Sequence, residues 1–531
     1  MRRNGNEAWK PDPWRVGIGM LAFAAAWLWL LDRAVLAPPT DNIEQLIWVR
    51  SLEWGYYKHP PLPTWLLWPV AQLMGGTAWA TYVMGAACAL GAFALMWRLL
   101  RDMRGEAHAA TAALAGLCVT FYNGRLYFYN HEIVLIPLVA GCALACWKAY
   151  TTRKIGWWIV LGGCLGLGAL AKYQIAVAGL AVLVFWCICK AWRDPMHVFG
   201  LQVAGLTALA VFAPHLVWLI QHDFEPLNYA MSSSLAAGLP WLARGHEVAK
   251  WWGDQLLNRA LPAWLFLAVL WLLGHRERRR LAASLNATST ATATSTACAT
   301  SGDAGRTLLL SFGLTPLVFV SVMALISGSH IQLHWGTPFL LFIVPAAMEW
   351  ARAAWSEPFR PRRAMLVFIV IQLMLMLRVE LTAPNGLALL RRPTDWRYFD
   401  AQALADALHG RAVAALGGPV RVISGPWEES GALSLRLPER PLVLIHGQLR
   451  FSPWVDATLV ADCGALELSK ARVSPGGSSR WERDFPICTG ASSRLSRLAA
   501  PAPRASGAEA ARQRPRRLGL TRRRCPVRAS G

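Results

Sequence analysis

The sequence is short of charge. Only 16% of its 531 residues are Asp, Glu, Lys or Arg, whereas 55% are hydrophobic and the mean hydropathy is +0.33. A soluble domain carries about 25% charged residues. The shortage therefore excludes an ordinary water-soluble enzyme and indicates that much of the chain lies in lipid.

Several motifs of other protein classes are also missing. The chain contains no glycine loop of the P-loop or dinucleotide type, so a nucleotide-driven reaction is unsupported. No local ligand spacing matches a recognised zinc pattern. The first apolar segment is long and lacks a small-residue cleavage site, so we interpret it as an anchor and not as a cleavable signal peptide.

The cysteines do not suggest a disulfide framework. Most of the eleven fall in apolar segments, where a thiol behaves as a small apolar side chain. Cys463 and Cys488 lie near the C-terminus and could pair if their compartment oxidises thiols. The sequence leaves this pairing open because it does not give the separation of the two residues.

Apolar runs of about 17 to 25 residues mark transmembrane helices. They predict an α-helical polytopic membrane protein with about eleven spans, within a range of about ten to thirteen. The predicted spans are residues 14–37, 78–100, 107–123, 132–150, 155–171, 173–190, 198–220, 257–274, 308–327, 336–353 and 364–383. The apolar stretch 62–76 is short and rich in proline, so we expect a helix lying along the membrane surface.

Lys and Arg collect beside alternate ends of these spans, and that side is expected to be cytoplasmic. The N-terminus is then inside, and the outside holds residues 38–62, 123–131, 221–256, 328–335 and everything after about 384. The formal charge of +22 invites a nucleic-acid function. No nucleic-acid-binding motif accompanies it, and contact with anionic lipids explains surface arginines more simply.

The composition changes after the last span. Residues 384–488 are less apolar, with β-rich runs at 420–424 and 441–445 and helical periodicity at 398–416, which predicts a small α/β domain. The predicted organisation is a multispan membrane domain at 1–383, a disordered low-complexity linker within it at 281–303, a periplasmic α/β domain at 384–488 and a disordered Arg-rich tail at 489–531.

The first outer loop carries two carboxylates. Asp41 and Glu44 are one helical turn apart, so a short helix would place both on one face. A partly desolvated carboxylate at a membrane boundary has a raised proton affinity and suits general-base catalysis. The alternative is that Asp41 caps a surface helix.

Several polar groups accompany these carboxylates. Lys58 and His59, stiffened by the prolines that follow, are cationic donors of a kind that binds phosphate, as is Arg125. Glu132 begins a span, where burial costs a few kcal/mol unless the charge is paired. Lys172 is a lone Lys between two apolar runs. We favour contact of its ammonium with a lipid phosphate over simple snorkelling of the side chain to the membrane interface.

Two other readings are open for the outer loops. Tyr122, Tyr127 and Tyr129 suit an interfacial aromatic belt. A divalent-metal site could be assembled from scattered side chains of the later loops, and the candidates are His222, Asp223, His330 and His334. The alternative is that these four line a water-filled cavity.

Taken in order, three motifs and the acidic first loop resemble a known family. The motifs are Gly55-Tyr-Tyr-Lys-His-Pro-Pro-Leu, Tyr127-Phe-Tyr-Asn-His-Glu and Leu170-Ala-Lys-Tyr. They resemble the bacterial polyprenyl-phosphate-sugar glycosyltransferases, C-type membrane enzymes related to protein O-mannosyltransferases and lipid A aminoarabinose transferases. The resemblance implies a multispan fold, a periplasmic active site and inverting transfer of a sugar from a polyprenyl phosphate to a lipid, glycan or protein acceptor.

The resemblance also implies roles for individual residues. Asp41 matches the catalytic aspartate of the first loop, and Lys172 matches the lysine of the Leu-x-Lys-Tyr segment. Glu132 falls near the acidic position of the second loop and is a further catalytic candidate. Relatives often have Asp-Glu where this chain has Asp-Asn, so Glu44 is the candidate for the second carboxylate. The residues expected to neutralise the departing phosphate are Lys58, His59, Arg125, Lys172 and Arg259.

Two other functions remain as alternatives. A flippase for a lipid-linked sugar would use a similar cationic lining, but it predicts charges near the midplane and repeated halves, and we find no convincing repeat. A polysaccharide ligase would show one long outer loop, for which residues 221–256 are long enough.

Overall fold

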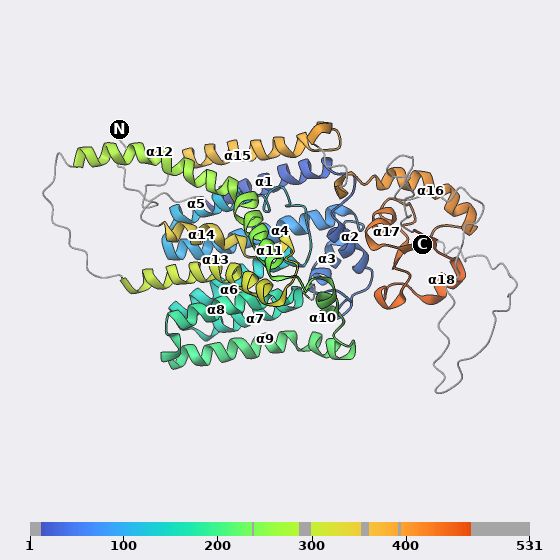
Figure 1. Ribbon diagram of the computed structural model, residues 1–531, viewed down its shortest axis with the longest axis horizontal. Helices are drawn as coiled ribbons and strands as arrows, with labels where there is room; N and C mark the ends of the chain where they lie inside the picture. The colour runs from blue at the N-terminus through green and yellow to red at the C-terminus, as the bar shows by residue number, and fades with distance from the viewer. Residues whose placement is uncertain (1–11, 236–237, 286–298, 352–359, 391–394, 469–531) are drawn as a thin grey trace. The chain divides into compact units, whose positions relative to one another are not determined.

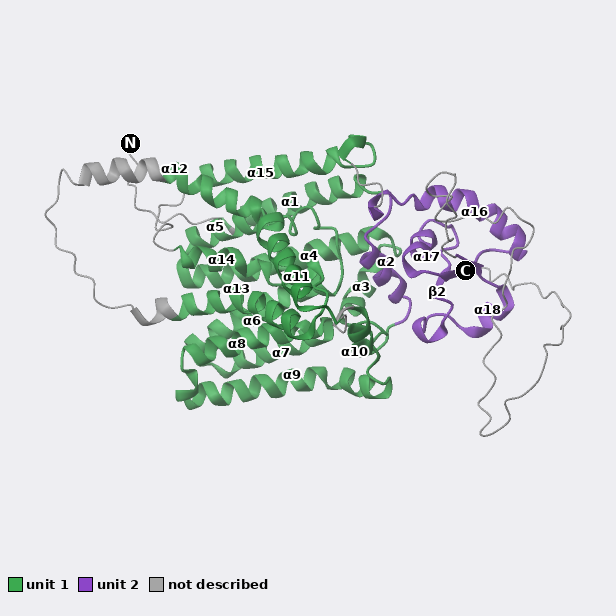
Figure 2. Cartoon of the chain, in the orientation of Figure 1, with its two compact units in different colours: residues 1–35, 52–392 green, residues 36–51, 393–531 purple. Residues whose placement is uncertain are grey.

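The computed structural model describes residues 12–235, 238–285, 299–351, 360–390 and 395–468 (Figure 1). The chain forms two compact units (Figure 2): unit 1 consists of residues 1–35 and 52–392, and unit 2 of residues 36–51 and 393–531. The predicted Arg-rich tail and Cys488 lie outside the described residues.

Unit 1 is built from helices. Its helices are α1 (Pro13–Arg33), α3 (Leu62–Leu73), α4 (Ala78–Arg104), α5 (Glu106–Leu117), α6 (His131–Thr152), α7 (Ile155–Ala171), α8 (Ala176–Ile188), α9 (Pro195–Gln221), α10 (Glu225–Ala230), α11 (Trp241–Gly253), α12 (Leu261–Leu285), α13 (Ala299–Ser327), α14 (Leu340–Trp350) and α15 (Pro361–Leu381). Short helical segments are η1 (Tyr173–Ile175), η2 (Ala191–Arg193), the π-helices η3 (Met231–Leu235) and η4 (Asp254–Arg259), η5 (Leu333–Gly336) and η7 (Ala388–Leu390).

Within the described part of the chain, six helices are long and apolar enough to cross a membrane: α1, α4, α6, α9, α13 and α15. A seventh span results if the pair formed by Trp241–Arg259 and Leu261–Gly274, bent by 51°, counts as one. Each predicted span overlaps a helix, but α5 has 12 residues and α14 has 11, fewer than the roughly 20 that a crossing needs. The count of eleven therefore stays a prediction.

The expected linker at 281–303 is helical at both ends. Helix α12 runs to Leu285 and α13 begins at Ala299, while residues 286–298 lie outside the described residues. The expected surface helix near 62–76 coincides with α3, which begins directly after Pro61.

Glycines allow helices α7 and α9 to pack closely. A Cβ on Gly162 would lie 2.3 Å from the carbonyl oxygen of Ala204, and one on Gly166 would lie 2.7 Å from the Cβ of Val211. Small residues four apart let two membrane helices approach until their backbones meet. Figure 1 shows α7 and α9 running side by side.

Polar side chains join helices that are otherwise apolar. Trp27 of α1 donates to the Gln372 amide oxygen of α15 at 3.1 Å, and Gln372 donates to the Leu117 carbonyl at 3.2 Å. Arg104 at the end of α4 donates twice to Glu349 of α14, at 2.6 and 2.9 Å. Glu349 is 1% exposed, so this forked pair compensates a charge that would otherwise be buried alone.

Unit 2 combines a parallel sheet with helices. Its elements are α2 (Thr40–Trp48), η8 (Trp396–Tyr398), α16 (Ala401–Leu416), β1 (Val422–Gly425), α17 (Trp427–Ser434), β2 (Leu442–Ile445), η9 (Leu449–Phe451), α18 (Ala457–Cys463) and β3 (Leu466–Glu467). The strand order is β2-β1-β3, and β1 pairs in parallel with both neighbours. The β-rich runs and the helical periodicity noted in the sequence coincide with β1, β2 and α16.

Unit 2 includes a piece of the predicted first outer loop. Ile43 and Ile47, one turn apart on α2, lie against Gly431 of α17, where an added Cβ would meet Ile43 Cγ2 at 2.3 Å. The predicted membrane domain over residues 1–383 included residues 36–51, which the structure assigns to unit 2. Cys463 is disulfide-bonded, and its pairing with Cys488 stays a prediction.

We predict that Gly162→Ala destabilises the protein by about 1–3 kcal/mol, because the new methyl group overlaps a backbone carbonyl that cannot rotate away. Gly163→Ala is the matched control, since no atom lies within 4 Å of its added Cβ, and Ala favours a helix over Gly. Thermal unfolding in detergent should show a lower Tm for the first variant only; equal Tm values would contradict the packing described.

Candidate active site

A buried ion pair joins α6 to the segment that follows α7. The Lys172 ammonium contacts Glu132 Oε1, and His334 Nε2 lies 3.2 Å from the same oxygen. Glu132 is 4% exposed. A buried carboxylate needs such compensation, because an unpaired charge costs several kcal/mol. The structure therefore brings together two predicted residues, Glu132 and Lys172, with a third that was proposed as a metal ligand.

Local backbone structure explains these positions. Asn130 caps α6 by accepting a hydrogen bond from the Ile133 amide at 3.0 Å, which places Glu132 in the first turn. Helix α7 ends at Ala171 because Lys172 adopts an extended conformation (φ −162°, ψ 135°). Gly168 permits the tight reversal, since a Cβ there would lie 2.4 Å from Ile175.

His59 stacks near this ion pair. Its ring centroid lies 4.1 Å from that of His131, the neighbour of Glu132. Burial of the ring, followed by the charges of His131, Lys172 and Lys58, holds the pKa of His59 well below its ordinary value. We expected a cation at this position. The structure indicates a neutral imidazole instead, because nearby positive groups oppose protonation.

Lys58 lies between two aromatic rings. Its ammonium is 5.4 Å from the Tyr57 ring centroid and 5.5 Å from that of Tyr229 on α10. Lys58 is 8% exposed, so these cation–π contacts compensate part of its lost hydration. The two rings hold this charge in place on one side of the segment that precedes α3.

Two further predicted cations lie on one ring. The guanidinium carbons of Arg125 and Arg259 are 5.9 and 5.5 Å from the centroid of Phe121. Arg125 is exposed, whereas Arg259 is buried and donates to Asp254 within η4. Since η4 is a π-helix at the bend before α12, Arg259 occupies the type of irregular turn that often accompanies function.

Two glutamines hold the turn that carries His334. Gln174 donates to the Trp335 carbonyl at 2.6 Å, and Gln255 donates to the Leu333 carbonyl at 2.8 Å. Gln255 also donates to Asp254 at 3.0 Å, the residue that accepts from Arg259. The η5 turn is therefore fixed from two sides.

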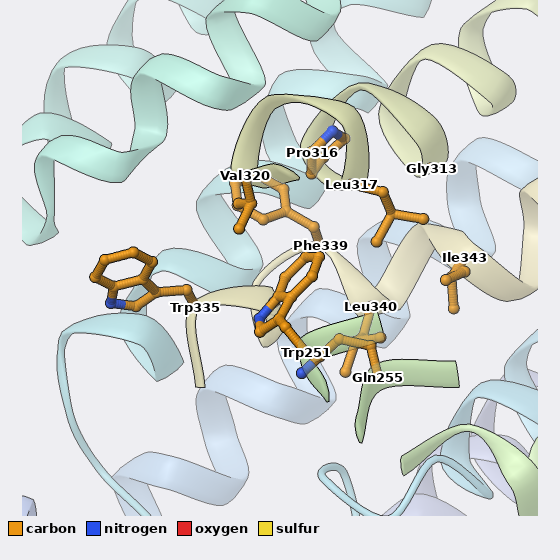
Figure 3. Close-up of a pocket in the computed structure, with 11 residues that line it drawn as sticks. Trp251, Gln255, Gly313, Pro316, Leu317, Val320, Trp335, Phe339, Leu340 and Ile343 are labelled. Carbon is orange, nitrogen blue, oxygen red and sulfur yellow. The ribbon is translucent and has the colours of Figure 1, made fainter. Parts of the chain in front are cut away.

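An apolar cavity lies beside this turn (Figure 3). Gln255 is its main polar lining group, and Trp335 of η5 lies on its edge. The lining residues are Trp251, Gln255, Gly313, Pro316, Leu317, Val320, Trp335, Gly336, Phe339, Leu340 and Ile343. The cavity is small, with an accessible volume of about 10 Å³, so it is a packing gap beside η5 and not a ligand pocket.

The first-loop carboxylates belong to unit 2. The short helix predicted there is α2, and Asp41 lies inside its first turn, after Pro39 at the N-cap. Asp41 therefore does not cap the helix, contrary to the alternative interpretation. Asp41 is partly exposed, whereas Glu44 is 5% exposed.

The four metal candidates do not converge. His222 Nδ1 bonds the Trp218 carbonyl at 2.8 Å, His330 lies 3.7 Å from Glu247, and His334 faces Glu132. Over the described residues, no group of three or more His, Cys, Asp or Glu side chains could hold a metal ion. The structure therefore does not bring these four residues together, because each His contacts a different local partner.

All three tyrosines of the expected aromatic belt are buried inside the protein, Tyr127 among them at 3% exposed. Tyr122 is 1% exposed and donates to the Thr337 carbonyl at 2.8 Å, and Tyr129 is fully buried and donates to the Pro63 carbonyl at 2.6 Å. Both hydroxyls anchor the loop between α5 and α6. Composition alone cannot separate such anchors from interfacial tyrosines, because both place one polar atom on an apolar body.

Four residues of this site were not predicted from the sequence: His131, Gln174, Tyr229 and Gln255. Gln174 directly follows Lys172-Tyr173, which was a usable signal. Tyr229 and Gln255 lie in irregular segments far along the chain from Lys58 and Lys172, and no periodic pattern could have found them.

We predict that Lys172→Met destabilises the protein by about 3–5 kcal/mol, because Glu132 is left buried without its main partner. Lys250→Met is the control: Lys250 is a half-exposed lysine 3.6 Å from Glu247, and surface pairs contribute about 0–1 kcal/mol. Chemical unfolding in detergent measures both. Similar small losses would show that the Lys172–Glu132 pair does not stabilise the fold.

We predict that His59→Gln reduces the acid sensitivity of folding. Because the pKa of His59 is depressed in the folded state, only the unfolded chain takes up this proton below about pH 6.5, so stability is lost as pH falls, by at most about 1.4 kcal/mol per pH unit. The variant should lose less Tm between pH 7 and pH 5 than the parent. Exposed His246→Gln should behave like the parent, and an unchanged slope in His59→Gln would refute the neutral imidazole.

Comparison with known proteins agrees with the resemblance found in the sequence. Residues 58–218 match the family described as dolichyl-phosphate-mannose-protein mannosyltransferase. The match begins at Lys58 and includes Glu132 and Lys172, but not Asp41 or Arg259.

Two curated relatives come from Rhizobium johnstonii. The chain is 27% identical over 193 residues to lipid A galacturonosyltransferase RgtD, a match that covers 34% of this chain and 38% of RgtD. It is 23% identical over 421 residues to lipopolysaccharide core galacturonosyltransferase RgtA, covering 76% of this chain and 77% of RgtA. The first match thus spans less than half of that relative's length.

The fold is similar to that of ArnT from Cupriavidus metallidurans. The apo crystal structure gives a TM-score of 0.54 at 15% identity, covering 85% of this chain and 89% of ArnT. The structure bound to undecaprenyl phosphate gives 0.50 at 14% identity, covering 83% and 77%. In its motifs and in its fold, the chain is similar to C-type membrane glycosyltransferases.

Proposed function

We propose that this protein transfers a sugar from a polyprenyl phosphate to an acceptor in the cell envelope, with inversion at the sugar carbon. The observation that carries the proposal is a pair of preorganised cations in unit 1. Lys58 lies between two aromatic rings, Lys172 pairs with Glu132, and both lie near enough to His59 for their charges to oppose its protonation. The likeness to transferases of lipid A and lipopolysaccharide supports a lipid or glycan acceptor over a protein.

The donor's phosphate would be the ligand of the cations. As the bond between sugar and phosphate breaks, negative charge develops on the departing polyprenyl phosphate, and preorganised cations lower the free energy of that state. Lys58 and Lys172 are held by neighbouring side chains before any ligand arrives, so little reorganisation is needed. Arg125 and Arg259 supply the forked donors that suit phosphate oxygens.

Glu132 was predicted as a catalytic carboxylate. Its contacts with Lys172 and His334 support a positioning role, because neighbouring positive groups stabilise the ionised carboxylate and make it a poor proton acceptor. His59 and His131 would act as neutral hydrogen-bonding groups. Gln255 donates to Asp254, which also accepts from Arg259.

Asp41 is the proposed general base, and this role rests on the first-loop resemblance. If the acceptor is a hydroxyl, the carboxylate accepts its proton while the new bond to the sugar carbon forms. If the acceptor is a phosphate, the carboxylate instead orients it or stabilises positive charge on the sugar. Glu44 is the candidate second carboxylate, and its burial favours a supporting role.

The proposed location is the bacterial inner membrane, with the N-terminus in the cytoplasm. The basic residues of α4, Arg98, Arg101 and Arg104, lie at its C-terminal end, which the distribution of Lys and Arg assigns to the cytoplasm. The cationic site and unit 2 would then face the periplasm.

The test is transfer from a panel of radiolabelled undecaprenyl-phosphate sugars to envelope lipid and protein fractions by detergent-purified protein. Asp41→Asn should lower the rate by about 10²–10⁴ at equal folded yield. Asp406→Asn, which changes an exposed carboxylate of α16, should keep the parent rate.

Three outcomes separate the alternatives. The labelled fraction identifies the acceptor class. Full activity in Asp41→Asn would remove this residue as the base. Binding of the donor without transfer by the parent protein would favour a flippase.

A further inference from the structure

Three consecutive residues after α7 each contact a different part of unit 1. Lys172 pairs with Glu132 of α6, the Tyr173 hydroxyl bonds His215 of α9, and Gln174 donates to the η5 turn. The first and third of these contacts lie in the site described above. The second leads to a buried histidine that the proposed mechanism does not use.

His215 bridges two segments that carry candidate cations. Its Nδ1 lies 2.6 Å from the Trp54 carbonyl oxygen, and its Nε2 lies 2.8 Å from the Tyr173 hydroxyl. A carbonyl can only accept, so Nδ1 donates, and the Tyr173 hydroxyl donates to Nε2 of a neutral ring. His215 is fully buried. One side chain thus connects the chain four residues before Lys58 with the residue after Lys172.

Packing holds the same segment against α9. An added Cβ on Gly55 would lie 2.4 Å from the Trp218 ring, so only glycine allows this approach. Trp218 stacks on His215, with ring centroids 5.6 Å apart and planes at 12°. On the other side, Trp65 donates to the Glu53 carbonyl at 2.9 Å. Residues 53–55 are therefore held from both sides, with His215 as the polar contact to α9.

We propose that His215 is a positioning residue that sets the Lys58–His59 segment relative to Lys172, through its paired hydrogen bonds to Trp54 and Tyr173. Because both cations then converge on one anion, His215 acts on binding of the lipid-phosphate donor and not on the acceptor. This inference rests on the proposed function. It adds His215, a residue from the interior of the apolar helix α9, to the residues that support the site. His215 itself contacts no substrate.

The first experiment measures kinetics of transfer from an undecaprenyl-phosphate sugar. His215→Ala should raise the donor KM about tenfold, while kcat and the acceptor KM stay within about twofold. His215→Asn should recover much of this change, because its amide nitrogen can take the place of Nδ1 and donate to Trp54. Tyr173→Phe keeps the ring, removes the hydroxyl and should give a smaller increase, and combined with His215→Ala it should add little.

His197→Ala is the matched control. His197 is also a buried histidine of α9, at the other end of the helix, where its ring centroid lies 5.1 Å from Tyr150 and 6.0 Å from Trp158. Its removal leaves a cavity of similar kind, so it should lower Tm comparably without changing the donor KM. An equal rise of the donor KM in both variants would reduce His215 to a general packing residue and overturn the proposal.

Hydrogen exchange supplies a readout that does not need activity. Amides of peptides covering residues 53–60 and 172–176 should exchange faster in His215→Ala than in the parent. Their exchange rates should be unchanged in His197→Ala. If the parent transfers sugar but His215→Ala alters neither exchange nor donor KM, the inference fails and the proposed function stands. If the parent transfers nothing while exchange rises as expected, the positioning contact stands and the proposed function fails.

Discussion

The ion pair between Lys172 and Glu132 is the contact on which the rest of the site depends. A carboxylate that is 4% exposed at the start of a membrane helix is tolerated only when its charge is compensated. This requirement brings the end of α7 to the start of α6, and His334 to the same oxygen. The loops around the ion pair, among them the η5 turn and the segment before Lys58, are then held next to it by their own polar residues.

Those loops are fixed by few, well-directed hydrogen bonds. Gln174 and Gln255 hold the η5 turn, and His215 holds the segment that precedes Lys58. Each of these hydrogen bonds is 2.6 to 2.8 Å long and at least partly buried. Loss of one partner would therefore leave a polar group unsatisfied. A site built this way is preorganised before a lipid-borne donor arrives, which is the condition under which cations stabilise a developing phosphate charge most effectively.

Much of the helical frame could be predicted because backbone groups in lipid must bond within their own segment, so apolar length reveals the helix. The prediction for residues 155–171 coincides with α7, and every predicted span overlaps a helix. The number of transmembrane spans was harder to predict because of short helices such as α5 and α14 and the bend at η4. Hydropathy does not distinguish a helix that crosses the membrane from a shorter helix buried inside the protein. Lys172 and Glu132 were also found from the sequence, because a charge beside an apolar run is rare.

By itself, the sequence determined that this is a helical membrane protein, which of its loops carry ionisable groups, and which family its motifs resemble. Those properties depend on composition and on neighbours along the chain. Only the tertiary structure decided that α2 with Asp41 packs in unit 2, that His59 is neutral, that the metal candidates face different partners, and that Tyr229, Gln255 and His215 support the site. Each of these depends on burial and on contacts between residues far apart in the chain, which no local pattern encodes.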